Sequence, residues 1–128
     1  MISGINHINL SVGDLDKAIA FYQNVMGFKL KHQWDEGAYF DAGGLWLCLS
    51  LIDSPVARPQ HDYTHYAFSI GQEDIKAFAG RLESHNIKQW KQNSSEGDSL
   101  YFLDPDGHKL EVHVGDMQSR LKHYIPAK

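Results

Sequence analysis

The order of strand-like and helical patterns occurs twice along this sequence, and that repetition constrains the fold more than any other feature. The first half opens with alternating polar and apolar residues at 5–12, followed by a helix with an apolar stripe at 15–26. The second half opens in the same way, with a strand at 63–70 and a helix at 73–82. Each helix precedes three strand-like stretches, at 29–34, 38–41 and 45–51 in the first half and at 88–91, 99–103 and 108–114 in the second. The sequence therefore predicts an α+β fold of two βαβββ modules.

Residue identities support an internal duplication. Four residues recur at a constant spacing of 58 positions, since His7, Ser11, Gly13 and Asp16 reappear as His65, Ser69, Gly71 and Asp74. Because these identities coincide with the matching order of elements, we interpret them as the trace of a duplicated module. We expect one domain of 128 residues, divided into module 1 at about 1–52, a linker with two prolines at about 53–62, module 2 at about 63–116 and a tail at 117–128.

Composition excludes several classes of partner. The formal net charge of -4 and the pI near 6.0 lack the basic excess of nucleic-acid binders, so we expect no nucleic acid. The single cysteine, Cys48, cannot form an internal disulfide, and the N-terminal residues lack the basic flank and apolar run of a secretory signal. No apolar run approaches the roughly 18 residues of a membrane span. We therefore expect a cytoplasmic protein that makes no membrane contact.

The polar faces of three strands carry the residues that can hold a metal ion. In each module the apolar face of the sheet should pack against the helix, which leaves the polar face free for function. His7 and His65 lie on equivalent polar faces, and Glu111 lies on the polar face of the last strand. A sheet curved around that face would bring the three together. Two imidazoles and one carboxylate suit Mn²⁺, Fe²⁺, Zn²⁺ or Ni²⁺ and leave positions open for a substrate.

Several of these patterns also have an ordinary structural explanation. Strand histidines are more often surface or hydrogen-bonding residues than ligands, and the ligand spacings here are too long for a local motif. The loop 92–99, rich in hydroxyl, amide and carbonyl oxygens, is either a solvated hairpin or a binding loop for a monovalent cation or an oxyanion. Lys91 and Arg120 are either surface charges or partners of an anionic substrate. Cys48 is best read as a packed neutral thiol rather than a fourth ligand.

Five segments together resemble a known family. They are NHINLSVGDLDKAIAFY, WLCLS, DYTHYAFSI, WKQNSSEGDS and YFLDPDGHKLEVHVGD. By these segments the chain resembles the vicinal oxygen chelate superfamily. Over nearly its whole length it is similar to the fosfomycin-resistance glutathione transferases within that superfamily. The resemblance implies cupped mixed sheets and a homodimer that exchanges modules. His7 of one chain would then meet His65 and Glu111 of the other around Mn²⁺ or another divalent ion.

The resemblance also assigns roles to single residues. The potassium loop is implied to be Asn93, Ser95, Gly97 and Ser99. Contacts to the fosfomycin phosphonate are implied for Lys91, Ser95, Ser99, Tyr101 and Arg120, with Asn9 beside the reacting epoxide and Trp46 in the pocket wall. Among these, Asn9, Lys91, Tyr101 and Arg120 are the implied catalytic residues. The glutathione site is implied to lie near Trp34, Tyr39 and Ser50.

The implied activity is addition of the glutathione thiol to the epoxide of fosfomycin, with Mn²⁺ as a Lewis acid and K⁺ orienting the phosphonate. Two features depart from the family pattern. Asn9 stands where a threonine is typical, and the chain ends at Lys128, earlier than typical relatives. Three alternatives remain: a fosfomycin epoxide hydrolase, a glyoxalase-like isomerase or Fe²⁺ dioxygenase, and a drug-binding protein without catalysis.

Overall fold

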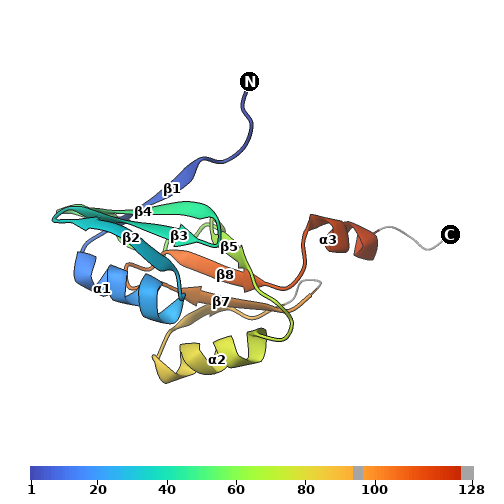
Figure 1. Cartoon of the computed structure of the whole chain (residues 1–128). Helices are drawn as coiled ribbons and strands as arrows, with labels where there is room; N and C mark the ends of the chain where they lie inside the picture. Colours follow the sequence, from blue (N-terminus) through green and yellow to red (C-terminus); the bar gives the residue numbers. More distant parts are fainter. Residues whose placement is uncertain (94–96, 125–128) are drawn as a thin grey trace. The chain divides into compact units, whose positions relative to one another are not determined.

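The chain divides into two compact units, residues 1–58 and 59–128, and the computed structural model describes residues 1–93 and 97–124. Each unit contains one four-stranded mixed sheet with a helix packed on one face, as Figure 1 shows for α1 and α2. Both follow the order βαβββ, so the expected α+β fold with two such modules is confirmed.

The first unit contains six elements. They are β1 (His7–Val12), α1 (Leu15–Ala20), a π-helical turn η1 (Phe21–Val25), β2 (Lys29–Trp34), β3 (Gly37–Ala42) and β4 (Leu45–Leu51). The strand order is β1-β4-β3-β2, with β1 parallel to β4 and the other pairs antiparallel. The outer strand β1 therefore runs beside β4, the last strand of the unit.

The second unit repeats this arrangement and adds a helix. Its elements are β5 (Tyr66–Ser69), α2 (Ile75–Ser84), β6 (Gln89–Lys91), β7 (Ser99–Leu103), β8 (Lys109–His113) and α3 (Met117–Tyr124). The strand order is β5-β8-β7-β6, with β5 parallel to β8. The expected tail at 117–128 is helical over the part that the structure describes, and α3 follows β8 in Figure 1.

One face of each sheet is buried under its helix because apolar residues alternate with polar ones along the strands. In the first unit Leu10, Phe40 and Leu47 are buried on this face, together with Tyr22 from η1. In the second unit the ring of Phe78 on α2 lies 5.6 Å from that of Phe102 on β7. Each such side chain contributes about 1.5–3 kcal/mol of hydrophobic free energy. The opposite faces are left for polar groups, as expected.

The helices differ in detail from the expected ranges. The predicted helix 15–26 is α-helical to Ala20 and then widens into η1, which ends before Gly27 at φ 74°. At its start the Asp14 carboxylate accepts a hydrogen bond from the backbone N–H of Lys17 at 3.1 Å. The second helix runs from Ile75 to Ser84 rather than 73–82, and Asn86 at φ 56° follows it.

Each sheet contains one β-bulge at a corresponding place, which the sequence did not predict. In β2 the register shifts between Leu30 and His32, and in β6 it shifts between Gln89 and Lys91. A bulge puts two consecutive side chains on the same face. Lys31 therefore joins His32 on the polar face of the first sheet, and Trp90 joins Lys91 on that of the second.

Candidate active site

The second unit brings His65 and Glu111 into direct contact on its polar face. Glu111 lies in β8 opposite Tyr101 of β7 and Ala67 of β5, and His65 immediately precedes β5. The Nε2 atom of His65 lies 3.0 Å from Oε1 of Glu111, which is only 6% exposed. Two of the three predicted metal ligands are therefore neighbours within one unit.

The hydrogen bonds of His65 fix which ring nitrogen is available to a ligand. Its Nδ1 atom lies 2.8 Å from the backbone oxygen of Tyr63, and a carbonyl oxygen only accepts, so Nδ1 carries the hydrogen. In the neutral ring Nε2 then presents a lone pair to a carboxylate oxygen. Two acceptors at this distance call for a cation, either a proton or a metal ion. The donor set therefore fits a divalent metal.

The second oxygen of Glu111 is held separately. The hydroxyl of Ser99 donates to Oε2 of Glu111 at 2.6 Å, and Nδ1 of His113 lies 2.6 Å from the same hydroxyl oxygen. Ser99 is 6% exposed, so these bonds are shielded from water. The carboxylate is thereby anchored through Oε2, which leaves Oε1 directed at His65.

Aromatic rings and one lysine surround this pair. The rings of Tyr63 and Trp90 lie 4.8 and 5.4 Å from that of His65. The Nζ atom of Lys91 donates to the Tyr63 hydroxyl at 2.6 Å and lies 4.9 Å from the centre of the Tyr101 ring. This hydrogen bond raises the pKa of Lys91 above its ordinary value, so the side chain carries a positive charge at neutral pH.

Arg120 supplies a second positive charge from α3. Its Nε atom is buried and has no hydrogen-bond partner among the residues that the structure describes. A buried donor without a partner is costly, so the position favours an acceptor from outside the chain. Lys91 and Arg120 are the two cationic residues that the sequence assigned to an anion.

The predicted cation loop is only partly described. The side-chain N–H of Asn93 donates to the backbone oxygen of Gly97 at 2.9 Å, which joins the two described residues on either side of 94–96. Gly97 has φ 74° and packs so tightly that an added Cβ would lie 2.5 Å from the oxygen of Val114. Ser95, assigned to both potassium and phosphonate, lies outside the described residues.

The polar face of the first unit carries His7. Its Nδ1 atom lies 2.8 Å from Oδ1 of Asn6, so its Nε2 atom is left for a ligand, as in His65. The His7 ring lies 4.6 Å from that of Trp46. Because the neighbouring rings continue along the face, His7 stands at the end of an aromatic row.

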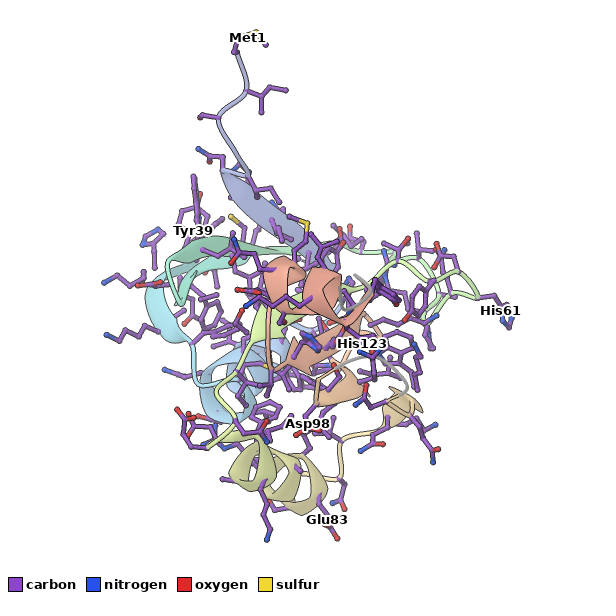
Figure 2. The ribbon with its side chains drawn as sticks, turned by 90° about the vertical axis from the view of Figure 1, so that its right-hand side faces the viewer. Met1, Tyr39, His61, Glu83, Asp98 and His123 are labelled. Carbon is purple, nitrogen blue, oxygen red and sulfur yellow. The ribbon has the colours of Figure 1, made fainter. Side chains whose placement is uncertain are left out.

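That row contains the residues assigned to the thiol. The Tyr39 ring lies 5.2 Å from Trp46 and 5.0 Å from Trp34. Figure 2 shows Tyr39 on the side of its sheet opposite α1. On the same face Ser50 donates its hydroxyl hydrogen to Oδ1 of Asn9 at 2.9 Å. The strand registers of the first unit thus gather Asn9, Trp34, Tyr39, Trp46 and Ser50 on one surface.

Cys48 occupies the position in the first unit that Glu111 occupies in the second. Cys48 pairs with Asn9 and Tyr39, and Glu111 pairs with Ala67 and Tyr101. Burial raises the pKa of the Cys48 thiol, which is 3% exposed. The thiol is therefore neutral at physiological pH, in agreement with its expected role as a packed residue.

Comparisons with known proteins decide the family. Residues 4–112 match the Glyoxalase/Bleomycin resistance protein/Dioxygenase superfamily. The chain is 47% identical over 123 residues to the glutathione transferase FosA of Serratia marcescens, covering 94% of this chain and 87% of that protein. It is 41% identical over 131 residues to the metallothiol transferase FosB of Lysinibacillus sphaericus, covering 99% and 93%. This chain belongs to the fosfomycin-resistance enzymes of that superfamily.

Solved structures of this family agree with the fold. The fosfomycin resistance protein FosX of Listeria monocytogenes, bound to Mn(II) and 1S,2S-dihydroxypropylphosphonic acid, superposes with a TM-score of 0.87 at 32% identity, covering 98% of this chain and 100% of that one. FosA is named a glutathione transferase and FosB a metallothiol transferase, whereas this FosX structure contains a dihydroxypropylphosphonic acid. Membership in the family therefore does not by itself identify the cosubstrate.

A second group of possible metal ligands lies in the turn between β7 and β8. The side chains of Asp104, Asp106 and His108 lie within 4.8 Å of one another. Asp104 already accepts hydrogen bonds from the backbone N–H groups of Asp106 and His108 and pairs with the His108 ring at 2.8 Å. These bonds occupy the oxygens of the most buried carboxylate. We interpret the group as a closed turn between the strands predicted at 99–103 and 108–114.

Two hollows of the first unit extend beyond the predicted residues. One of about 300 Å³ is lined by Tyr39, Trp46 and Lys31, the residue that the β2 bulge adds to the polar face. A larger one of about 670 Å³ touches Trp34 but is otherwise lined by residues such as Asp14 and Asp35. The first is the better candidate for a binding pocket because it is lined by two rings of the aromatic row, whereas the larger hollow is lined by one. Local sequence patterns did not place Lys31 and Trp90 on the polar faces, since only strand pairing reveals a bulge.

No helix among the described residues is long and apolar enough to cross a membrane.

Proposed function

We propose that this fosfomycin-resistance enzyme is a Mn²⁺-dependent, K⁺-assisted transferase that adds the thiol of glutathione to the epoxide of fosfomycin. Its 47% identity to the FosA glutathione transferase supports this choice of cosubstrate. The observation that carries the proposal is the 3.0 Å contact between Nε2 of His65 and Oε1 of Glu111. Nε2 of His65 is free for a ligand because Nδ1 bonds to the backbone oxygen of Tyr63. Oε1 of Glu111 is free because Oε2 accepts the hydrogen bond from Ser99.

His7, His65 and Glu111 would hold the divalent ion. His7 and His65 both use Nδ1 as a hydrogen-bond donor, which leaves two equivalent Nε2 lone pairs. When bound, the ion supplies a Lewis acid with a net charge of about +1 that polarises the epoxide oxygen. The protein supplies the geometry that makes the polarised bond accessible to the thiol.

The basic groups of the second unit would bind the phosphonate. Lys91 carries a positive charge, which its bond to the Tyr63 hydroxyl favours further, and the buried Nε atom of Arg120 lacks an acceptor among the described residues. Tyr101 and Ser95 are further phosphonate contacts in this proposal, and so is Ser99, whose hydroxyl hydrogen would turn from Glu111 to the phosphonate when the drug binds. Asn93, Ser95, Gly97 and Ser99 would hold K⁺, whose charge also favours the anion. Binding of the phosphonate fixes the epoxide in one orientation.

The aromatic face of the first unit would receive glutathione. Trp34, Tyr39 and Ser50 form its wall, with Trp46 shared with the drug. In the reaction the glutathione sulfur bonds to a ring carbon, the epoxide C–O bond breaks, and the alkoxide takes up a proton from solvent. Asn9 would contact this oxygen through its amide N–H, because its carbonyl oxygen already accepts from Ser50. We place this reaction in the cytoplasm, where thiols stay reduced.

The proposal includes a homodimer in which His7 of one protomer meets His65 and Glu111 of its partner. The exposed state of His7 and Trp46 supports this arrangement, since Trp46 is 41% exposed and a partner surface would cover it. In such a twofold dimer the same exchange builds two identical sites.

The test incubates purified protein with fosfomycin, Mn²⁺ and K⁺ and follows the product by phosphorus NMR. Parallel samples contain glutathione, L-cysteine or no thiol. A thioether adduct formed fastest with glutathione supports the proposal. The dihydroxypropylphosphonate without thiol would assign the protein to epoxide hydrolysis, and preference for L-cysteine would assign another thiol. Unchanged fosfomycin in all samples would reject the proposed reaction.

A further inference from the structure

A chain of hydrogen bonds connects His113 to the carboxylate of Glu111. Nδ1 of His113 lies 2.6 Å from the hydroxyl oxygen of Ser99, which lies 2.6 Å from Oε2 of Glu111. The direct distance from the ring to the carboxylate is longer, at 3.5 Å. Strand pairing produces this chain, because Ser99 lies opposite His113 and Glu111 precedes His113 by two residues on the same face.

The direction of each bond follows from the donors available. An ionised carboxylate only accepts, so the single hydroxyl hydrogen of Ser99 points at Glu111. The Ser99 oxygen then accepts from His113, which places the ring hydrogen of His113 on Nδ1. The bonds therefore run in one direction, from His113 through Ser99 to Glu111.

We infer that His113 is a positioning residue that orients Glu111 through Ser99. The terminal torsion of a glutamate side chain is broad, so its carboxylate plane is set by whatever binds it. With Oε2 anchored by Ser99, Oε1 faces Nε2 of His65. The inference rests on the proposed function where it concerns the metal, since that pair of atoms is the proposed ligand pair.

Packing holds the His113 ring in place. An added Cβ at Gly97 would lie 3.1 Å from Cε1 of His113, so the ring is in close contact with the backbone there. The ring is 14% exposed. A ring confined in this way keeps Nδ1 directed at Ser99, so His113 acts through a fixed donor and not through contact with a substrate.

The experiment compares two amide replacements of His113. In His113→Asn the amide nitrogen takes the place of Nδ1 and can still donate to Ser99, whereas in His113→Gln it falls near the place of Nε2. We expect His113→Gln and Ser99→Ala to weaken Mn²⁺ binding, measured by electron paramagnetic resonance of free Mn²⁺, about 10- to 100-fold. His113→Asn should stay within about threefold of the wild type, and the exposed His61→Gln should be unchanged. Adding His113→Gln to Ser99→Ala should cost little more, because both break one chain.

A measurement without metal keeps the inference separate from the proposed function. Nitrogen-15 NMR of the metal-free protein should show the His113 hydrogen on Nδ1, and this signature should disappear in Ser99→Ala. Melting temperatures identify any variant that fails to fold. A hydrogen on Nε2, or equal Mn²⁺ affinity for the Asn and Gln variants, would overturn the role of His113. If the wild type shows the Nδ1 signature but binds no Mn²⁺, the proposed metal site fails while the hydrogen-bond chain stands.

Discussion

Replacement of Gly97 by alanine should damage both stability and metal binding. Gly97 adopts φ 74°, and a Cβ there would lie 2.5 Å from the carbonyl oxygen of Val114 and 3.1 Å from the ring of His113. The strand end that carries this oxygen is held in place, because the N–H of Val114 is bonded to the oxygen of Asp98 at 2.9 Å. The substitution therefore pushes on the strand end that positions Glu111.

Gly43 provides a matched control. It has φ 65°, but an added Cβ would meet nothing within 4 Å. Gly43→Ala therefore measures the cost of a left-handed residue alone, about 1–2 kcal/mol. Gly97→Ala adds the steric term, about 1–3 kcal/mol by analogy with overpacked cores. For a chain of this size that difference lowers the melting temperature by roughly 4–12 °C more than Gly43→Ala does.

The assay is thermal unfolding of both variants followed by circular dichroism, combined with titration of Mn²⁺. Gly97→Ala should melt below Gly43→Ala, and its Mn²⁺ affinity should fall about tenfold because His113 and Ser99 shift. Gly43→Ala should bind Mn²⁺ as the wild type does. Equal melting temperatures and equal Mn²⁺ affinities for the two variants would refute the reasoning.

Three further predictions concern single side chains. Because burial raises the Cys48 pKa above 9.0 in the folded state, the unfolded chain loses this proton first, and stability should fall by up to about 1.4 kcal/mol per pH unit above pH 9. Chemical denaturation between pH 8 and 10 should show that the free energy of unfolding falls less steeply with pH in Cys48→Ala than in the wild type. Identical slopes of this free energy against pH would contradict the prediction. Lys91→Gln should raise the KM for fosfomycin several-fold without changing that for glutathione, and steady-state kinetics showing the reverse would argue against a phosphonate contact. Asn9→Thr should raise kcat in the same assay, whereas a fall would show that the amide contributes.

Local patterns were sufficient to predict most strands of the two sheets. The stretches 29–34, 45–51 and 99–103 coincide with β2, β4 and β7, because runs of strand-forming residues between turn residues are a local signal. Alternation of polar and apolar residues along the last strand placed Glu111 on a polar face. It did not reveal that Glu111 contacts His65 within one unit, since that depends on the pairing of β5 with β8.

Other features of the site depend on register, which local patterns do not contain. The bulges that turn Lys31 and Trp90 toward the polar faces follow from the pairing of β2 with β3 and of β6 with β7. The bond between Ser99 and His113 likewise joins residues of different strands. The burial of the Arg120 Nε atom depends on how α3 packs. The sequence alone did not indicate that this charged side chain is partly buried.

The most direct test of the proposed site mixes two inactive variants, His7→Gln and Glu111→Gln, after unfolding and refolding them together. Random pairing of equal amounts makes half of the dimers hybrids. If His7 of one protomer meets Glu111 of the other, each hybrid contains one intact site of two. The mixture should then regain about one quarter of the wild-type activity and bind a matching fraction of Mn²⁺. An inactive mixture, with hybrid dimers verified by mass spectrometry, would contradict the exchange of ligands between protomers.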